Sequence, residues 1–188
     1  MEALIVIAIL GILLTITVAA FGHYLQESRL TSTTRRVAQA VMLARMKAVS
    51  TNMDYTFHMD ASVSPNTFQI SGTNDTNGNS SLDPWEDVNG NGAIVTDTVY
   101  STAQTLDAPI VDHQGISTFP LGLNSGQVLA NGSTLDLVFN GRGVTKGGAP
   151  AIQCIVLQYT DNSQAITFDE TGHVRMFRYV GGWIEITQ

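Results

Sequence analysis

The feature that most constrains this 188-residue chain is a nineteen-residue run from Ala3 to Phe21 that carries no charge and is dense in Ile, Leu and Val. At a rise of 1.5 Å per residue, such a helix spans about 28 Å, close to the hydrocarbon core of a bilayer. A cleavable secretory signal is the alternative, but no basic region precedes the run and no small-residue cleavage pattern clearly ends it. A helix that is apolar on all sides needs lipid or other helices around it. We therefore expect residues 1–22 to form a transmembrane-length helix half, which the rest of the chain cannot bury and which lipid or other helices must cover.

The helical pattern continues beyond the apolar run, but there it becomes one-sided. Apolar residues recur with helical spacing over residues 23–52, and basic residues occupy the remaining surface. The residues expected to lie against the sheet are Val37, Val41, Ala44 and Ala48, with Met42, Met46 and Val49 alongside them. No proline occurs before Pro65, so one helix of about 50 residues, or about 75 Å, is geometrically allowed. The sequence predicts an amphipathic second half of the same helix over residues 23–52.

Charge divides the chain into two parts. It holds 9 Lys and Arg against 16 Asp and Glu, a formal net charge of −7. Residues 1–50 contain five basic and two acidic residues, a sum of +3, so the remainder carries −10. A nucleic-acid binder that works through a globally basic surface is therefore disfavoured. Cys154 is the only cysteine, so no intramolecular disulfide can form, and a metal ion is the obvious alternative for fixing a long loop.

After Asn52 the hydrophobic period changes from helical to alternating, which predicts short β-strands. Turn chemistry separates these strands, as at Glu170-Thr171-Gly172 and Gly181-Gly182. We expect residues 53–188 to form an antiparallel β domain with a meandering sheet, whose apolar face the amphipathic helix half covers. The fold class is thus α+β. The expected strands are Tyr55–Met59, Phe68–Ile70, Ile94–Tyr100, Leu135–Phe139, Gln153–Tyr159, Ala165–Phe168, Val174–Tyr179 and Trp183–Ile186.

The start of the chain, Met-Glu-Ala-Leu-Ile-Val-Ile-Ala-Ile-Leu-Gly-Ile-Leu-Leu, resembles the N-terminal segment of type IV pilins and type II secretion pseudopilins. The diagnostic part is Glu2 followed by the apolar run, with Gly11 nine residues on. The Leu-Ala-Arg-Met-Lys-Ala-Val block at residues 43–49 looks most like the FimT/GspH branch. A looser resemblance to that branch lies at Phe139–Gly143 and Ile166–Arg175. The resemblance implies a pilin-like fold with the apolar helix half protruding.

The same resemblance implies a structural subunit of an extracellular or periplasm-spanning type IV pilus-like filament, built from identical copies through residues 1–22. A precursor would wait in the inner membrane, be trimmed by a prepilin peptidase, and be added by assembly machinery to a cell-surface filament. Family members usually begin three residues earlier, with an N-methylated Phe. The alternative is a minor pilin or pseudopilin at the filament tip, acting in DNA uptake or in type II protein secretion.

Three residues near the start are candidates for assembly. A carboxylate among aliphatic side chains is costly unless it is paired, so we expect Glu2 to pair with the N-terminal amine of an adjacent subunit, carried here by Met1. An interfacial glutamate that reaches water is the alternative. Gly11 permits close helix approach or local unwinding, although glycine is also common in membrane helices without such a role.

Residues 74–92 form a tract of oxygen-bearing side chains separated by turn formers. Their spacing follows the ligand order of an EF-hand loop, with carboxylates at its first and twelfth positions and Ser80 where glycine is usual. The flanks are not helical, so we expect a structural calcium ion without EF-hand helices; an Asn/Gly-rich turn that binds nothing is the alternative. The candidate ligands are Asp75, Asn77, Asn79, Ser81, Asp83 and Glu86, with Asp87, Asn89 and Asn91 beginning an incomplete second copy.

The sequence offers little for catalysis. The four histidines are far apart, Cys154 sits in an apolar run that suits a core strand, and no nucleophile-elbow motif occurs. We therefore expect a protein that is not an enzyme. Gly172-His173-Val174-Arg175 with Arg178 resembles a diluted form of the DNA-binding motif of some FimT-like minor pilins. Two arginines on a body of charge −10 would contact few phosphates, so nucleic acid is not the expected partner.

Overall fold

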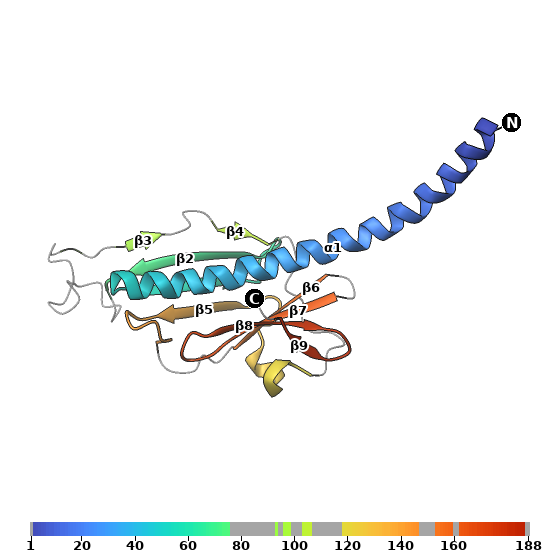
Figure 1. The fold of residues 1–188 in the computed structure, drawn as a ribbon. Coiled ribbons are helices and arrows are strands. Elements are labelled where there is room, and N and C mark those ends of the chain that lie inside the picture. Colours follow the sequence, from blue (N-terminus) through green and yellow to red (C-terminus); the bar gives the residue numbers. More distant parts are fainter. Residues whose placement is uncertain are drawn as a thin grey trace.

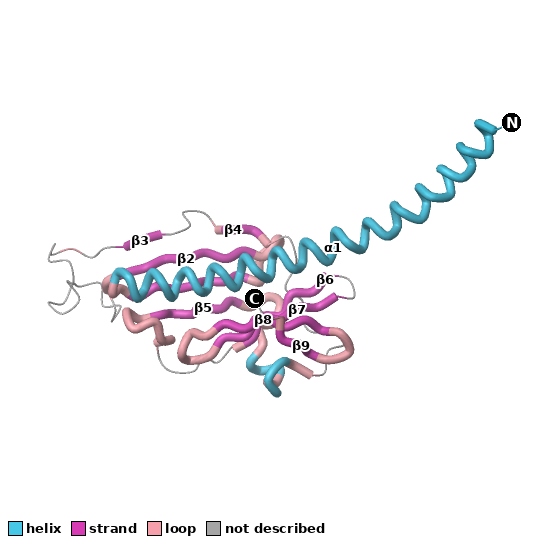
Figure 2. Tube along the Cα trace, viewed as in Figure 1, coloured by secondary structure: helices cyan, strands magenta, loops and turns pink. Residues whose placement is uncertain are grey.

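The computed structural model describes residues 2–75, 93, 96–98, 103–106, 118–146, 153–159 and 162–186. Within these ranges the side chains of residues 2–5, 8, 12–21, 23, 97 and 98 are not described. One helix, α1, runs without interruption from Glu2 to Thr51. Its C-terminal half lies along the β-strands, while its N-terminal half extends away from them (Figure 2). The prediction of a single helix of about 50 residues is confirmed.

The strands form two antiparallel sheets instead of the one meandering sheet that we predicted. Sheet A has the order β3-β2-β1-β5, with β4 also paired to β2, and sheet B has the order β6-β7-β8-β9 (Figure 1). Sheet A contains β1 (Asp54–Asp60), β2 (Thr67–Thr73), β3 (Thr96–Thr98), β4 (Gln104–Thr105) and β5 (Thr134–Phe139). Sheet B contains β6 (Cys154–Tyr159), β7 (Asn162–Phe168), β8 (Val174–Tyr179) and β9 (Trp183–Glu185).

The amphipathic half of α1 packs on both sheets. Val37, Val41, Ala44 and Ala48 are fully buried, as expected from their spacing. They join one core with alternate residues of the sheets, including the aromatic rings of Tyr55, Phe57 and Phe139 and the aliphatic side chains of Leu137, Ile155 and Ile166. The prediction of an α+β domain with the helix covering an antiparallel sheet is therefore confirmed. The other face of sheet A is polar, with Gln69 and Asp136 exposed.

Sheet B is covered on its second face as well, which the sequence did not predict. The segment containing the short 3₁₀ turns η1 (Pro120–Gly122) and η2 (Ser125–Gln127) contributes Phe119 and Val128 to a smaller core with Cys154, Val156, Ala165 and Phe177. Burial raises the pKa of the Cys154 thiol to about 12. Cys154 is thus a core residue, as predicted, and an unreactive thiol.

The end of α1 is held between two turns that contain glycines. Asn52 ends the helix in the left-handed region, with φ of 53°. Arg45 donates hydrogen bonds to the carbonyl oxygens of Gly143 at 3.0 Å and of Gly172 at 3.5 Å. A Cβ at Gly172 would lie 3.0 Å from the Arg45 Cδ, the Gly143 oxygen and the Phe139 ring. Gly172, predicted as a turn residue, therefore also allows its turn to approach the helix closely, and Gly143 does the same for the other turn.

We expect Gly172→Ala to destabilise the protein more than Gly132→Ala, because both residues have positive φ but only Gly172 is crowded. The left-handed backbone alone costs about 1–2 kcal/mol with a Cβ present. Crowding against the Phe139 ring and the Gly143 oxygen adds about 1–3 kcal/mol at position 172. Urea unfolding of the two variants measures the difference, and equal losses would contradict the close approach.

Candidate assembly interface

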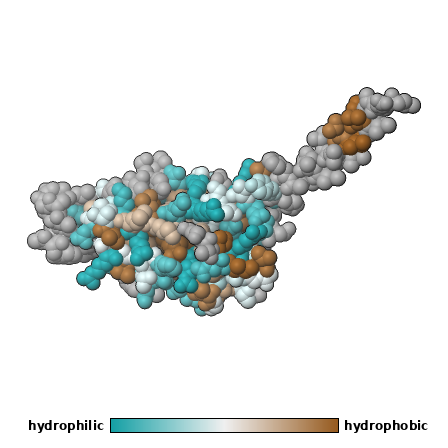
Figure 3. All heavy atoms as spheres, in the orientation of Figure 1, coloured by the Kyte–Doolittle hydropathy of each residue, from teal (hydrophilic) through white to brown (hydrophobic). Residues whose placement is uncertain are grey.

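The N-terminal half of α1 projects from the body, and the large apolar side chains described in its first turns are uncovered. Leu30 is the first residue of the chain that belongs to the described core. Before it, Val6, Ile7, Ile9 and Leu10 are each more than half exposed. Figure 3 shows them as a hydrophobic surface far from the body, and Figure 1 shows the blue end of α1 extending beyond the strands. A Cβ added at Gly11 would meet no atom within 4 Å. The predicted assembly residue therefore lies on an open surface of the projecting helix.

Two other assembly candidates lie at the limit of what the structure describes. Met1 is outside the described residues, and Glu2 begins α1 although its side chain is not described. Among the parts of the chain that are described, no helix has the combination of length and hydropathy needed to cross a membrane. The pairing of Glu2 with an N-terminal amine stays a prediction.

Polar contacts fix α1 where it enters the body. Arg178 of β8 forms a salt bridge with Glu27 at 2.5 Å. One turn farther along, the Gln164 side-chain amide donates a hydrogen bond to the Thr31 hydroxyl at 2.9 Å. On the other side, Arg36 donates to the carbonyl oxygen of Thr105 at 3.3 Å. Together with Arg45 at the far end, these contacts hold the helix at both ends of the body.

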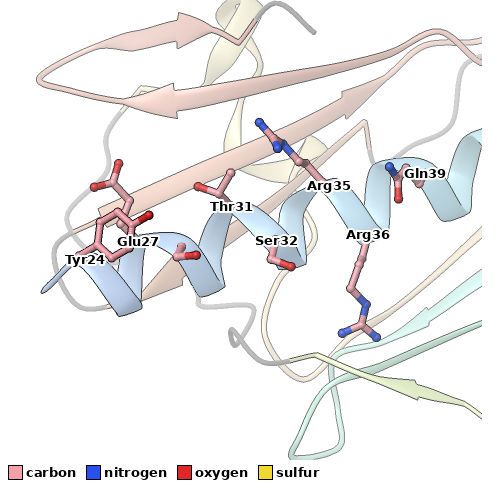
Figure 4. A pocket seen from close by; sticks show the side chains of 8 residues that line it. Tyr24, Glu27, Thr31, Ser32, Arg35, Arg36 and Gln39 are labelled. Atoms are coloured by element: carbon pink, nitrogen blue, oxygen red, sulfur yellow. The ribbon is translucent and has the colours of Figure 1, made fainter. Parts of the chain in front are cut away.

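The solvent side of α1 is polar over its first four turns on the body. A groove of about 510 Å³ runs along this side (Figure 4). In that view Arg35 and Arg36 leave the helix in opposite directions, and Tyr24 lies beside Glu27. The groove is lined by Tyr24, Glu27, Ser28, Thr31, Ser32, Arg35, Arg36 and Gln39.

Farther along, the solvent side of α1 becomes apolar. Met46 is 61% exposed and Val49 is 53% exposed, with Met42 and Leu43 partly buried beside them. A groove of about 400 Å³ containing Phe68 runs along one side of this stripe, and one of about 470 Å³ containing Val174 runs along the other. Met42, Met46 and Val49 follow i, i+4, i+7 spacing, so the helix has a second apolar stripe besides the buried one. We call Met42, Leu43, Met46 and Val49 the outer stripe.

The expected pattern sets Met42, Met46 and Val49 alongside the buried residues of α1 and does not separate the two faces of the helix. The sequence spacing does distinguish the two faces of the helix, because residues 37, 41, 44 and 48 form one helical series and residues 42, 46 and 49 form another. Arg178 was likewise assigned only to a possible DNA motif, whereas the structure uses it to hold the helix.

The two arginines of that motif are not brought together. Strand residues three apart point to opposite faces of a sheet. Met176, on the same face as Arg178, belongs to the core under α1, whereas Phe177, on the same face as Arg175, belongs to the smaller core. Arg178 is paired with Glu27, and the Arg175 Nε contacts His173 Nδ1 at 3.4 Å. The pair therefore offers no common phosphate-binding surface.

Asp169 shapes the turn that presses Gly172 against α1. Burial pushes its pKa upward, but hydrogen bonds from the Thr171 hydroxyl and from the backbone N–H groups of His173 and Thr171 outweigh that effect. The pKa of Asp169 is therefore lower than its ordinary value. The carboxylate is a structural element of this turn.

The Asn/Asp-rich tract 74–92 belongs to the connection between β2 and β3. Its base is closed by the pairing of Thr73 with Thr96 and by a hydrogen bond from the Asn74 side-chain amide to the Ala93 carbonyl oxygen at 3.2 Å. Asp75 lies just beyond β2, and its N–H donates to the Thr73 hydroxyl at 3.1 Å. The remaining calcium candidates, Asn77, Asn79, Ser81, Asp83, Glu86, Asp87, Asn89 and Asn91, lie outside the described residues. Where side chains are described, no group of three His, Cys, Asp or Glu could hold a metal ion.

Comparison with protein-family models, with curated proteins and with solved structures finds no match to this chain. The features that bear on function are therefore those of the chain itself, namely an exposed apolar helix half, an outer stripe and a polar, acidic body.

We expect calcium to stabilise a fragment that begins at Tyr24, which keeps every residue of the described core. At 10 mM calcium, a site with an affinity of about 10⁻⁴–10⁻³ M contributes about 1.4–2.7 kcal/mol, or roughly 3–10 °C in Tm. Glu86→Gln removes the twelfth-position carboxylate and should abolish the increase, while magnesium at equal ionic strength controls for charge screening. If neither calcium nor a chelator changes the Tm, tract 74–92 does not bind a stabilising calcium ion.

Proposed function

We propose that this protein is a structural subunit of a pilus-like filament, assembled from identical copies through the N-terminal half of α1. The observation that carries the proposal is the exposure of Val6, Ile7, Ile9 and Leu10 on a helix that projects from a folded body. Full burial of an Ile, Leu or Val side chain contributes about 1.5–3 kcal/mol, and these four are 53–65% exposed, so covering them contributes on the order of 3–7 kcal/mol. The body cannot cover them, because α1 is one continuous helix and its N-terminal half extends away from the strands (Figure 1).

Other copies of the same helix are suitable partners for this surface. Each copy of the chain has an apolar helix half that must be covered, so copies can cover one another. A repeated head-to-tail contact that does not close into a ring produces a filament. The resemblance to pilins and pseudopilins supports this reading. It also supports a precursor in the inner membrane, a prepilin peptidase that trims it, and machinery that adds it to a cell-surface filament.

The body suits the outside of such a filament. It carries most of the acidic residues of a chain whose net charge is −7, and the outer face of sheet A is polar. We propose no catalytic role, and we propose the calcium ion of tract 74–92 as a structural stabiliser. A DNA-binding tip subunit is less well supported, because Arg175 and Arg178 lie on opposite faces of sheet B.

Deleting residues 3–21 should give a soluble monomer with an unchanged body, because the described core begins at Leu30. In cells that make this protein, the full chain should be recovered in sheared surface filaments and the deletion variant should not. Sedimentation velocity of the purified variant measures its monomeric state, and a circular dichroism melt is the control for folding. A deletion variant that still enters filaments would refute the role of the apolar helix half.

A further inference from the structure

We infer that the outer stripe of one subunit receives the N-terminal helix half of a second copy, in parallel orientation and displaced by about 36 residues along α1. This inference rests on the proposed function and specifies the partner surface within it. It concerns a face of the body half of α1 that is exposed in the monomer.

The outer stripe has the properties of a receiving surface. Met46 and Val49 are more than half exposed, although large apolar side chains on a helix of a folded body are usually turned inward. The two grooves beside the stripe, of about 400 and 470 Å³, give room for side chains of a neighbouring helix. Methionine adapts its shape to a partner, which suits Met42 and Met46 to such a contact.

The chain itself contains a segment of matching pattern. Val6, Leu10 and Leu13 have the same spacing, four and then three residues, as Met42, Met46 and Val49. Parallel helices that place these two sets side by side differ by 36 residues, as 42 − 6, 46 − 10 and 49 − 13 all show. At 1.5 Å per residue the second copy is displaced by about 54 Å along the helix axis.

Charge sets the direction of the second helix. Glu2 is the only charged residue before Glu27, so, from its N-terminus onward, the helix half has one acidic residue followed by apolar residues. Along the receiving helix, Arg35 and Arg36 come first and the outer stripe follows. A displacement of 36 residues brings Glu2 to the level of Ala38, one turn from Arg35, which is exposed. An antiparallel helix would place Glu2 beyond the apolar stripe, so the charges favour the parallel arrangement.

Such a contact joins two different surfaces and cannot close on itself between two chains. Each subunit donates its N-terminal half to one neighbour and receives the same segment from another, so the contact propagates. The paired positions Leu10 and Met46 therefore come from different subunits, and a covalent link between them would connect chains in series.

The direct test is a cysteine cross-link in sheared filaments. The variant carries Leu10→Cys and Met46→Cys, and oxidation followed by a non-reducing gel should give a ladder of dimers, trimers and higher species. Each single substitution is a control, because one cysteine can link at most two chains. Leu10→Cys with Gln69→Cys is a second control, since Gln69 lies on the outer face of sheet A. Cys154 does not interfere, because it is fully buried.

The outcomes separate this inference from the proposed function. Filaments that contain the double variant but give no ladder would overturn the inference and leave the filament role intact. A wild-type chain that is absent from filaments would overturn both.

If the double variant is not assembled into filaments, a comparison of two lysine variants tests the inference instead. Met46→Lys should keep the folded body, because residue 46 is 61% exposed, yet lower the amount of chain in filaments by about tenfold or more through a buried charge. Gln69→Lys should leave it unchanged. Assembly of Met46→Lys at the level of the wild type would overturn the inference.

Discussion

The N-terminal half of α1 carries an apolar surface that the β domain cannot bury, and this surface is the main constraint on the molecule. The first half of α1 is long, uncharged after Glu2 and projects beyond the sheets, so its apolar side chains must be covered by something outside the chain. The remainder of the molecule is compatible with this constraint. The acidic residues lie mostly after residue 50, and the described exposed apolar side chains of the N-terminal half of α1 lie at the opposite end of the molecule.

Polar contacts hold the C-terminal half of α1 on the body, near Glu27 at one end and at Arg45 at the other. At the entrance, Glu27 pairs with Arg178 and Thr31 accepts from Gln164; at the far end, Arg45 reaches the carbonyl oxygens of Gly143 and Gly172. Between them lies the fully buried stripe of valines and alanines. The Thr33 hydroxyl and the Gln164 side-chain oxygen are buried in this region without a hydrogen-bond partner among the described atoms, a cost that the apolar packing offsets. A helix fixed in this way presents its projecting half in a defined direction, which a repeating assembly requires.

Much of this fold could be predicted from local pattern, because helical and alternating periods report directly which residues face a core. The long helix, its buried residues Val37, Val41, Ala44 and Ala48, and most strand positions followed from that signal. The division into two sheets did not, because it depends on which strands pair over long distances, and alternation within a strand does not encode its partner. The same limit hid the link between Arg178 and Glu27. The calcium prediction falls on residues outside those described, apart from Asp75, and remains a prediction.

The central claim is that the apolar half of α1 is covered by copies of itself. The most direct measurement is an electron cryomicroscopy reconstruction of filaments sheared from cells that make the protein. It should place the N-terminal halves of α1 together along the filament axis, with the β domains facing outward. Filaments held together by contacts between β domains, with the helices pointing away from the axis, would contradict the account.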